Sequence, residues 1–149
     1  MIEHYWTVFC SKSVIDKDAN TISLFDALEQ ITVYGTPPPG GKTEGIPMEN
    51  SIVSFWGRTE EGRPAKGTVR YFIEYRGGGD DRTTDPHEIT IDLSEYTRSR
   101  TRALMNILPL MGAGKHWVRV FLKQENQDDW DLVASVPYHV EFKPEGGSK

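Results

Sequence analysis

The fold is decided by a stretch near the middle of the chain, Val69-Arg70-Tyr71-Phe72-Ile73-Glu74-Tyr75-Arg76. Its odd-numbered residues are all apolar or aromatic, whereas its even-numbered residues include three charged side chains. Because successive side chains of a β-strand point to opposite faces of a sheet, this alternation predicts a strand with one face in a core. We therefore predict a central strand over 67–76, with the odd-numbered set buried.

Outward from this stretch, the same alternation recurs at 88–93, 118–123 and 138–142. Shorter apolar runs lie at 5–14, 21–25, 31–34 and 51–56, and clusters of Gly, Pro, Asn and Asp separate them. About nine short strands with frequent turns are typical of a sandwich of two sheets. We predict an all-β chain that forms an antiparallel β-sandwich.

One segment, 97–108, fits two structures. Four apolar residues fall at helical spacing: Ala103, Leu104, Ile107 and Leu108. Three arginines fall at strand spacing: Arg98, Arg100 and Arg102. We favour a strand because every neighbouring segment reads as one.

The segment 35–50 interrupts the alternation with four prolines and four glycines. Proline lacks a backbone donor and glycine is costly to order, so we predict one long surface loop over 35–50. The chain has 149 residues, which fits a single domain. We place that domain at 1–143 and expect a disordered tail at 144–149.

The composition limits the expected partners. There are 22 acidic and 17 basic side chains, and the formal net charge of −5 disfavours binding to nucleic acid or to an anionic membrane. No apolar run approaches the ~18 residues of a membrane-spanning helix, so we expect no membrane insertion. The single cysteine, Cys10, excludes an intrachain disulfide, and the N-terminus lacks a secretory signal. We therefore expect a cytoplasmic protein; its oligomeric state is left open.

Three acidic turns are candidates for calcium. They hold Asp16 and Asp18, then Asp80 and Asp81, then Asp128 and Asp129. Carboxylates gathered at one end of a sandwich can bind Ca²⁺, as in C2 domains. Aspartate is also an ordinary turn residue, because its side chain bonds to the nearby backbone, and we favour this structural interpretation.

A stripe of three arginines is a candidate for anions. On a strand, Arg98, Arg100 and Arg102 project from one face at intervals of about 6.8 Å, a row that could hold phosphates. The alternative is a hairpin of 87–93 with 98–106, in which Glu88 and Asp92 lie opposite the arginines. We favour the hairpin.

No motif indicates catalysis or a cofactor. The four histidines are scattered, and no nucleophile elbow, phosphate-binding loop or dinucleotide fingerprint occurs. We expect no catalytic residue, no cofactor and no metal. Trp117 and Phe121 share a strand face with cations and could form a platform for a sugar or a partner, although sandwiches more often bury such residues.

Both ends of the chain resemble a group of small bacterial cytosolic proteins of unknown function. The similar segments are 9–16 (Phe9-Cys10-Ser11-Lys12-Ser13-Val14-Ile15-Asp16), 21–31, 114–120 and 136–140. The resemblance implies an immunoglobulin-like sandwich and carries over no catalytic residue. The long segment 35–50 has no match in that group.

The expected function is a non-enzymatic binding or interaction module that presents loops to a protein partner. We expect the loops 35–50 and 77–86 to meet it, because loops on a rigid scaffold commonly carry binding residues. Two alternatives remain: a C2-like domain that responds to calcium or lipid, and an enzyme with a cryptic pocket.

Overall fold

Ten β-strands form in the part of the chain that the computed structural model describes, residues 1–40, 42–77 and 80–145, with Asp80 described by its backbone alone. Their bounds are β1 Ile2–Asp16, β2 Thr21–Ala27, β3 Gln30–Tyr34, β4 Glu44–Arg58, β5 Ala65–Gly77, β6 Asp80–Thr83, β7 His87–Leu93, β8 Arg98–Leu110, β9 Gly114–Gln124 and β10 Asp131–Lys143. No helix long and apolar enough to cross a lipid bilayer occurs among the described residues.

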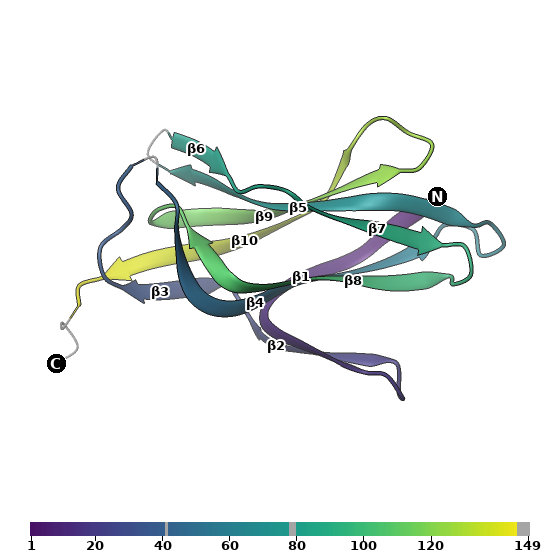
Figure 1. Cartoon of the computed structure of the whole chain (residues 1–149), viewed down its shortest axis with the longest axis horizontal. Helices are drawn as coiled ribbons and strands as arrows, with labels where there is room; N and C mark the ends of the chain where they lie inside the picture. Colours follow the sequence, from purple (N-terminus) through teal and green to yellow (C-terminus); the bar gives the residue numbers. More distant parts are fainter. Residues whose placement is uncertain (41, 78–79, 146–149) are drawn as a thin grey trace.

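The strands form two sheets that pack face to face (Figure 1). Sheet 1 has the order β2-β1-β4-β8, and sheet 2 has the order β3-β10-β9-β5-β6, with β7 also paired to β5. This arrangement confirms the predicted all-β sandwich. The structure corrects two details: β3 pairs with β10 in parallel, and β1 and β4 are long strands of 15 residues each.

Strand β5 confirms the register that its alternation predicts. Val69, Tyr71, Ile73 and Tyr75 are between 0% and 7% exposed, and they face sheet 1 across the core. The largest side chains with less than 2% exposure are Trp56, Tyr71, Tyr138, Phe9, Ile52, Ile91, Leu93, Leu108, Leu110, Met111, His116 and Val53.

A polar network lies inside this core. The indole Nε1–H of Trp56 donates to Thr101 Oγ1 at 2.9 Å, and Thr101 also bonds to the hydroxyl of Tyr71. The His4 ring packs edge-on against Trp56, with ring centroids 5.1 Å apart. Trp56, Tyr71 and Thr101 lie on β4, β5 and β8, so the network joins the two sheets.

The predicted loop at 35–50 is wrong for its second half. Residues 44–50 belong to β4, and 44–47 and Asn50 pair with β8, so the connection ends at residue 43. Pro47 is tolerated because it adjoins a bulge between Pro47 and Asn50, where the ladder is already interrupted. The side-chain amide of the buried Asn50 bridges the interrupted ladder, because it donates hydrogen bonds to Met48 O on β4 and to Ile107 O on β8. The predicted loop 77–86 is likewise interrupted by β6, and residues 78–79 lie outside the described part.

The segment 97–108 forms a strand from residue 98 onward, as the sequence predicts, and this strand, β8, continues to Leu110; the predicted hairpin of 87–93 with 98–106 is wrong. β7 pairs with β5 in sheet 2, whereas β8 pairs with β4 in sheet 1. The connection 94–97 therefore crosses from one sheet to the other. Of the tail expected to be disordered, residues 146–149 lie outside the described part.

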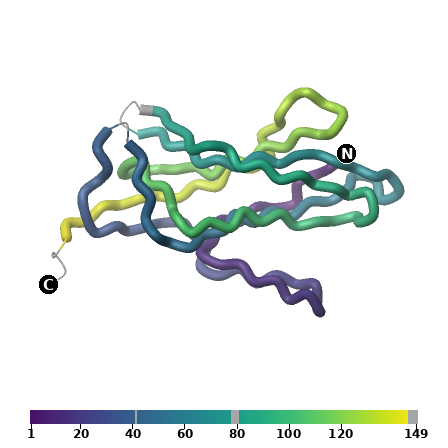
Figure 2. The backbone as a smooth tube through the Cα atoms, in the orientation of Figure 1, coloured from purple at the N-terminus to yellow at the C-terminus, as the bar shows by residue number. Residues whose placement is uncertain are grey.

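The β1–β2 hairpin extends beyond the rest of the sandwich as an arm (Figure 2). Asp16 Oδ1 at its tip accepts hydrogen bonds from the backbone N–H groups of Asp18 and Ala19. Asn20 closes the turn with a left-handed backbone, φ +52°, a conformation that asparagine tolerates better than most residues. The arm brings Asn20 beside β8.

Candidate functional site: an arginine cleft

A bulge in β1 positions an aromatic group beside the site. The pairing of β1 with β4 shifts between His4 and Trp6, so Tyr5 is an extra residue on β1. A bulge re-aims the side chains beside it. The Tyr5 ring lies where a Cβ atom at Gly57 would collide with it, so glycine is required there. The rings of Tyr5 and Trp6 pack against Phe55 with centroids 5.2 and 5.7 Å apart.

Beside this aromatic group lies a cleft of about 600 Å³ between the β1–β2 arm and strands β4 and β8. We call it the arginine cleft, and it is lined by Ile15, Asn20, Phe55, Tyr96, Arg98, Ser99 and Arg100. The guanidinium of Arg100 donates to Asn20 O at 2.8 Å and to Asn20 Oδ1 at 3.3 Å. It also lies 5.9 Å from the centroid of the Phe55 ring.

The arginines of β8 form no ion pair with an acidic side chain of the described ranges. Among the described residues, no carboxylate oxygen lies within 4.0 Å of Arg98, Arg100 or Arg102. Arg102 is 3.4 Å from both Ser13 O and Ser13 Oγ, and Arg98 is exposed at the mouth of a second hollow of about 160 Å³. Among the described residues, the cleft therefore carries two guanidinium groups with no carboxylate oxygen in direct contact.

The sequence-based pairing of these arginines with Glu88 and Asp92 is wrong. Glu88 binds Arg70 at 2.6 Å, and Asp92 lies 3.9 Å from Lys66, so both acids are held on sheet 2. The reason is topological: the chain changes sheets between β7 and β8. The three arginines do share one face of β8, as their spacing predicts.

Replacement of Arg100 by alanine is expected to change the free energy of unfolding by less than about 1 kcal/mol. Its bonds reach only the exposed tip of the arm, so little packing is lost. Urea denaturation of the variant beside the wild type measures the change. A loss above about 2 kcal/mol would mean that this contact holds the arm in place.

The acidic turns are not gathered into one cage. Asp16 and Asp18 lie at the tip of the β1–β2 arm, Asp128 and Asp129 lie in the β9–β10 turn, and Asp81 lies in β6 (Figure 1). The side chain of Asp80 lies outside the described part. Within that part, no group of three or more His, Cys, Asp or Glu side chains could hold a metal ion.

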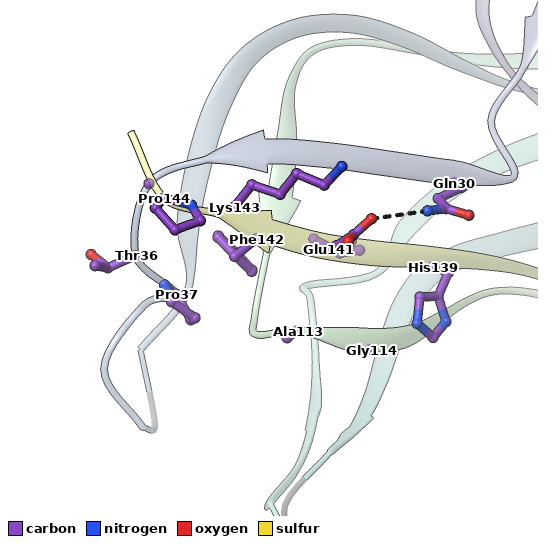
Figure 3. Close-up of a pocket in the computed structure, with 12 residues that line it drawn as sticks. Gln30, Thr36, Pro37, Ala113, Gly114, His139, Glu141, Phe142, Lys143 and Pro144 are labelled. Carbon is purple, nitrogen blue, oxygen red and sulfur yellow. Dashed lines mark hydrogen bonds between the residues drawn. The ribbon is translucent and has the colours of Figure 1, made fainter. Parts of the chain in front are cut away.

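A hollow of about 860 Å³ lies where β3 and β10 end (Figure 3). Residues 35–37 line it, so the first part of the segment 35–50 does border a concave surface. The Glu141 carboxylate accepts a hydrogen bond from Gln30 Nε2 at 3.2 Å. His139 lies near Gly114 at one end of this hollow, while Pro144 and Thr36 lie at the other. Its polar groups are spread out and do not converge on one point.

Neighbouring side chains of the same sheet cover part of the rings of Trp117 and Phe121, for which the sequence offered an aromatic platform. The Lys115 ammonium and the Arg119 guanidinium lie 4.9 and 4.8 Å from the Trp117 ring centroid. Phe121 stacks on Phe72 at 5.5 Å. These contacts leave less ring surface for a ligand than the sequence pattern indicated.

The sequence predicts the arginines of the cleft but neither the aromatic group beside it nor the presence of Asn20 in its lining. The adjacent pair Tyr5-Trp6 was the available signal, because two consecutive large aromatics at the start of an alternating strand are compatible with a bulge. Nothing in the sequence shows that the arm brings Asn20 to β8.

Comparison with known proteins shows no matching family model and no matching curated protein. Three similar solved structures are an alkylpurine DNA glycosylase from Pseudomonas fluorescens bound to DNA (14% identity, TM-score 0.48), a β-glucosidase from Listeria innocua (8%, 0.45) and an immunoglobulin-like protein from Pseudomonas aeruginosa (7%, 0.37). The matches cover 74%, 91% and 95% of this chain. The chain spans only 27% and 16% of the first two proteins, and 97% of the third. Its own strands and sheets define the protein as an all-β sandwich, and likenesses this distant assign it no activity.

Proposed function

We propose that this protein is a non-enzymatic binding module whose arginine cleft takes an anionic group of a partner. One observation carries the proposal: Arg98 and Arg100 line a cleft of about 600 Å³, and no carboxylate of the described chain lies within 4.0 Å of either. On sheet 2, by contrast, Arg119 lies 2.7 Å from Glu74 and Arg70 lies 2.6 Å from Glu88.

The chemistry of the cleft suits a carboxylate or a phosphate. A guanidinium presents parallel N–H donors that match two oxygens of such a group. The hydrogen bonds to Asn20 and the Phe55 ring hold Arg100 in position, so less side-chain freedom is lost on binding. Because the whole chain is acidic, we propose a protein partner in the cytoplasm and no nucleic acid or membrane.

Two potential nucleophiles or bases lie in the core and not at the cleft, which supports a binding role. Cys10 is fully buried, and burial raises the pKa of its thiol. His116 is also fully buried.

The test uses pyrophosphate as a small anionic probe. We expect it to move the NMR signals of the Arg98 and Arg100 guanidinium groups and of the Tyr96 ring. Arg98→Gln and Arg100→Gln should each weaken binding by about tenfold or more, because a hydrogen bond to a charged group contributes about 1.5–3 kcal/mol. The effect should shrink at high salt, since ions screen exposed charges.

Arg63→Gln is the matched control, since Arg63 is an exposed arginine 3.7 Å from Glu60 and outside the cleft. It should leave pyrophosphate binding unchanged. Equal losses in all three variants, or no signal change at Arg98 and Arg100, would refute the proposal.

A further inference from the structure

Strand β8 is an edge strand of sheet 1. Its 13 residues pair with β4 on one side, and no other described strand pairs with β8. An unpaired edge exposes backbone N–H and C=O groups that can accept a further strand.

The inner side of this edge opens into a slot of about 320 Å³ between the two sheets. Ile52, Tyr71, Ile73, Ala103 and Met105 line the slot, and residues 84–87, Ile107 and Pro109 also border it. The slot exists because sheet 2 is interrupted here: β6 ends at Thr83 and β7 begins at His87. Thr84 bonds back to the Ile73 backbone and leaves this side of the sandwich uncovered.

Residue 87 shows how open the slot is. His87 pairs with Tyr71 across β7 and β5, so it belongs to the same alternating set as Ile89, Ile91 and Leu93. That set faces the core, yet His87 is exposed. A side chain on the core face is solvated only where the opposite sheet does not cover it.

The outer side of the same edge carries positive charge and apolar surface. Arg98, Arg100 and Arg102 lie there without acidic partners among the described residues, and Leu104 follows on the same face at 60% exposure. A partner strand would place its own side chains alternately on these two sides, because the period of a strand is two.

We infer that β8 pairs with an extended segment of a partner protein whose apolar side chains enter the slot and whose alternate acidic side chains lie opposite the arginines. The inference rests on the proposed function and names its partner class. Charge complementarity selects this occupant. If β8 paired antiparallel with β8 of a second copy, in a register centred on Arg100, arginine would lie opposite arginine, which is destabilising.

The test uses synthetic peptides of about eight residues, the length of an ordinary strand. The probe alternates Glu and Val, and a second peptide alternates Lys and Val. We expect the Glu-Val peptide to bind and to slow backbone hydrogen exchange in 98–107, and the Lys-Val peptide to bind at least about tenfold more weakly. In the charge-reversed variant R98E/R100E/R102E this preference should invert.

Two further probes separate strand pairing from simple charge attraction. A Glu-Val peptide in which alternate amides are N-methylated keeps its charge but lacks the backbone N–H groups that would pair with β8. It should bind at least about tenfold more weakly than the unmethylated peptide. Ala103→Leu, which fills the slot, should also weaken binding, and a melting curve checks that this variant folds.

The outcomes distinguish this inference from the proposed function. If pyrophosphate binds at Arg98 and Arg100 but N-methylation does not change the affinity of the peptide, strand pairing at β8 is refuted and the anion site stands. If the peptide binds by its backbone and pyrophosphate does not bind, the anion site fails. Three outcomes would overturn the inference. They are that the Glu-Val peptide does not bind, that it slows hydrogen exchange only outside 98–107, or that the protein forms a dimer through β8 in solution.

Discussion

Replacement of Trp56 by alanine is expected to lower the free energy of unfolding by about 3–5 kcal/mol. The side chain is 0% exposed and packs against the His4 ring, so its removal leaves a large cavity in the core. Its indole N–H also donates to Thr101, and the variant leaves that buried hydroxyl with one partner fewer. Since small domains are stable by only about 5–15 kcal/mol, the loss should be large in chemical denaturation.

Trp56→Phe is the matched control for this prediction. It keeps an aromatic ring but removes the donor, so we expect a smaller loss of about 1–2 kcal/mol. Chemical denaturation monitored by far-ultraviolet circular dichroism measures both variants. A loss below about 1 kcal/mol for Trp56→Ala would contradict the central place of this residue in the core.

Acidification is expected to destabilise the protein through His116. The ring is fully buried and stacks on Tyr138 at 4.9 Å, and burial lowers the pKa of His116 to about 4. Its Nδ1 bonds to Gly114 O, and its Nε2 accepts the Met111 N–H at 3.4 Å. A proton added to Nε2 would face that N–H donor, so the folded state favours the neutral ring. The nearby cations Arg82 and His139 oppose protonation as well.

The sign follows from proton linkage. Between pH 6.5 and about 4 the unfolded chain binds a proton at residue 116 that the folded protein does not bind, so stability rises with pH in this window. Lowering the pH through it should remove about 3 kcal/mol, at 1.36 kcal/mol per pKa unit. Urea denaturation at a series of pH values measures the slope.

The control for the pH effect is His116→Phe, which keeps an aromatic ring and removes the titrating group. Burial also lowers the pKa of His4, and a neighbouring serine lowers that of Asp92, so the wild type carries other acid-sensitive groups. Only the difference in slope between wild type and variant reports on His116. Identical slopes would show that His116 titrates normally.

The sequence predicted which faces of the strands are buried but not which strands are neighbours. Alternation reports the direction of each side chain, and the buried set of β5 followed from it directly. It carries no information on pairing partners, so the parallel pair of β3 and β10 and the crossing from β7 to β8 could not be predicted. Pro47 favours a loop when only the sequence is known, because proline cannot donate to a strand ladder. The bulge that accommodates it depends on the contact of Asn50 with Ile107 of β8, which the sequence does not show.

The same limit applies to the candidate site. The spacing of Arg98, Arg100 and Arg102 placed them correctly on one face of a strand. Whether that face is neutral or charged depends on the strand beside it, and the topology put Glu88 and Asp92 on the other sheet.

The parallel pair of β3 and β10 also means that, during synthesis, β3 is made well before the strand with which it pairs. His139 pairs with Gln30, and the two residues are 109 positions apart, from 139 − 30. At a synthesis rate of about 5–20 residues per second, β3 waits roughly 5–20 s before its partner strand has been made. During that interval Ile31 and Val33 lack the strand that will flank them, so a ribosome-bound chain has to keep this short edge from pairing with other strands.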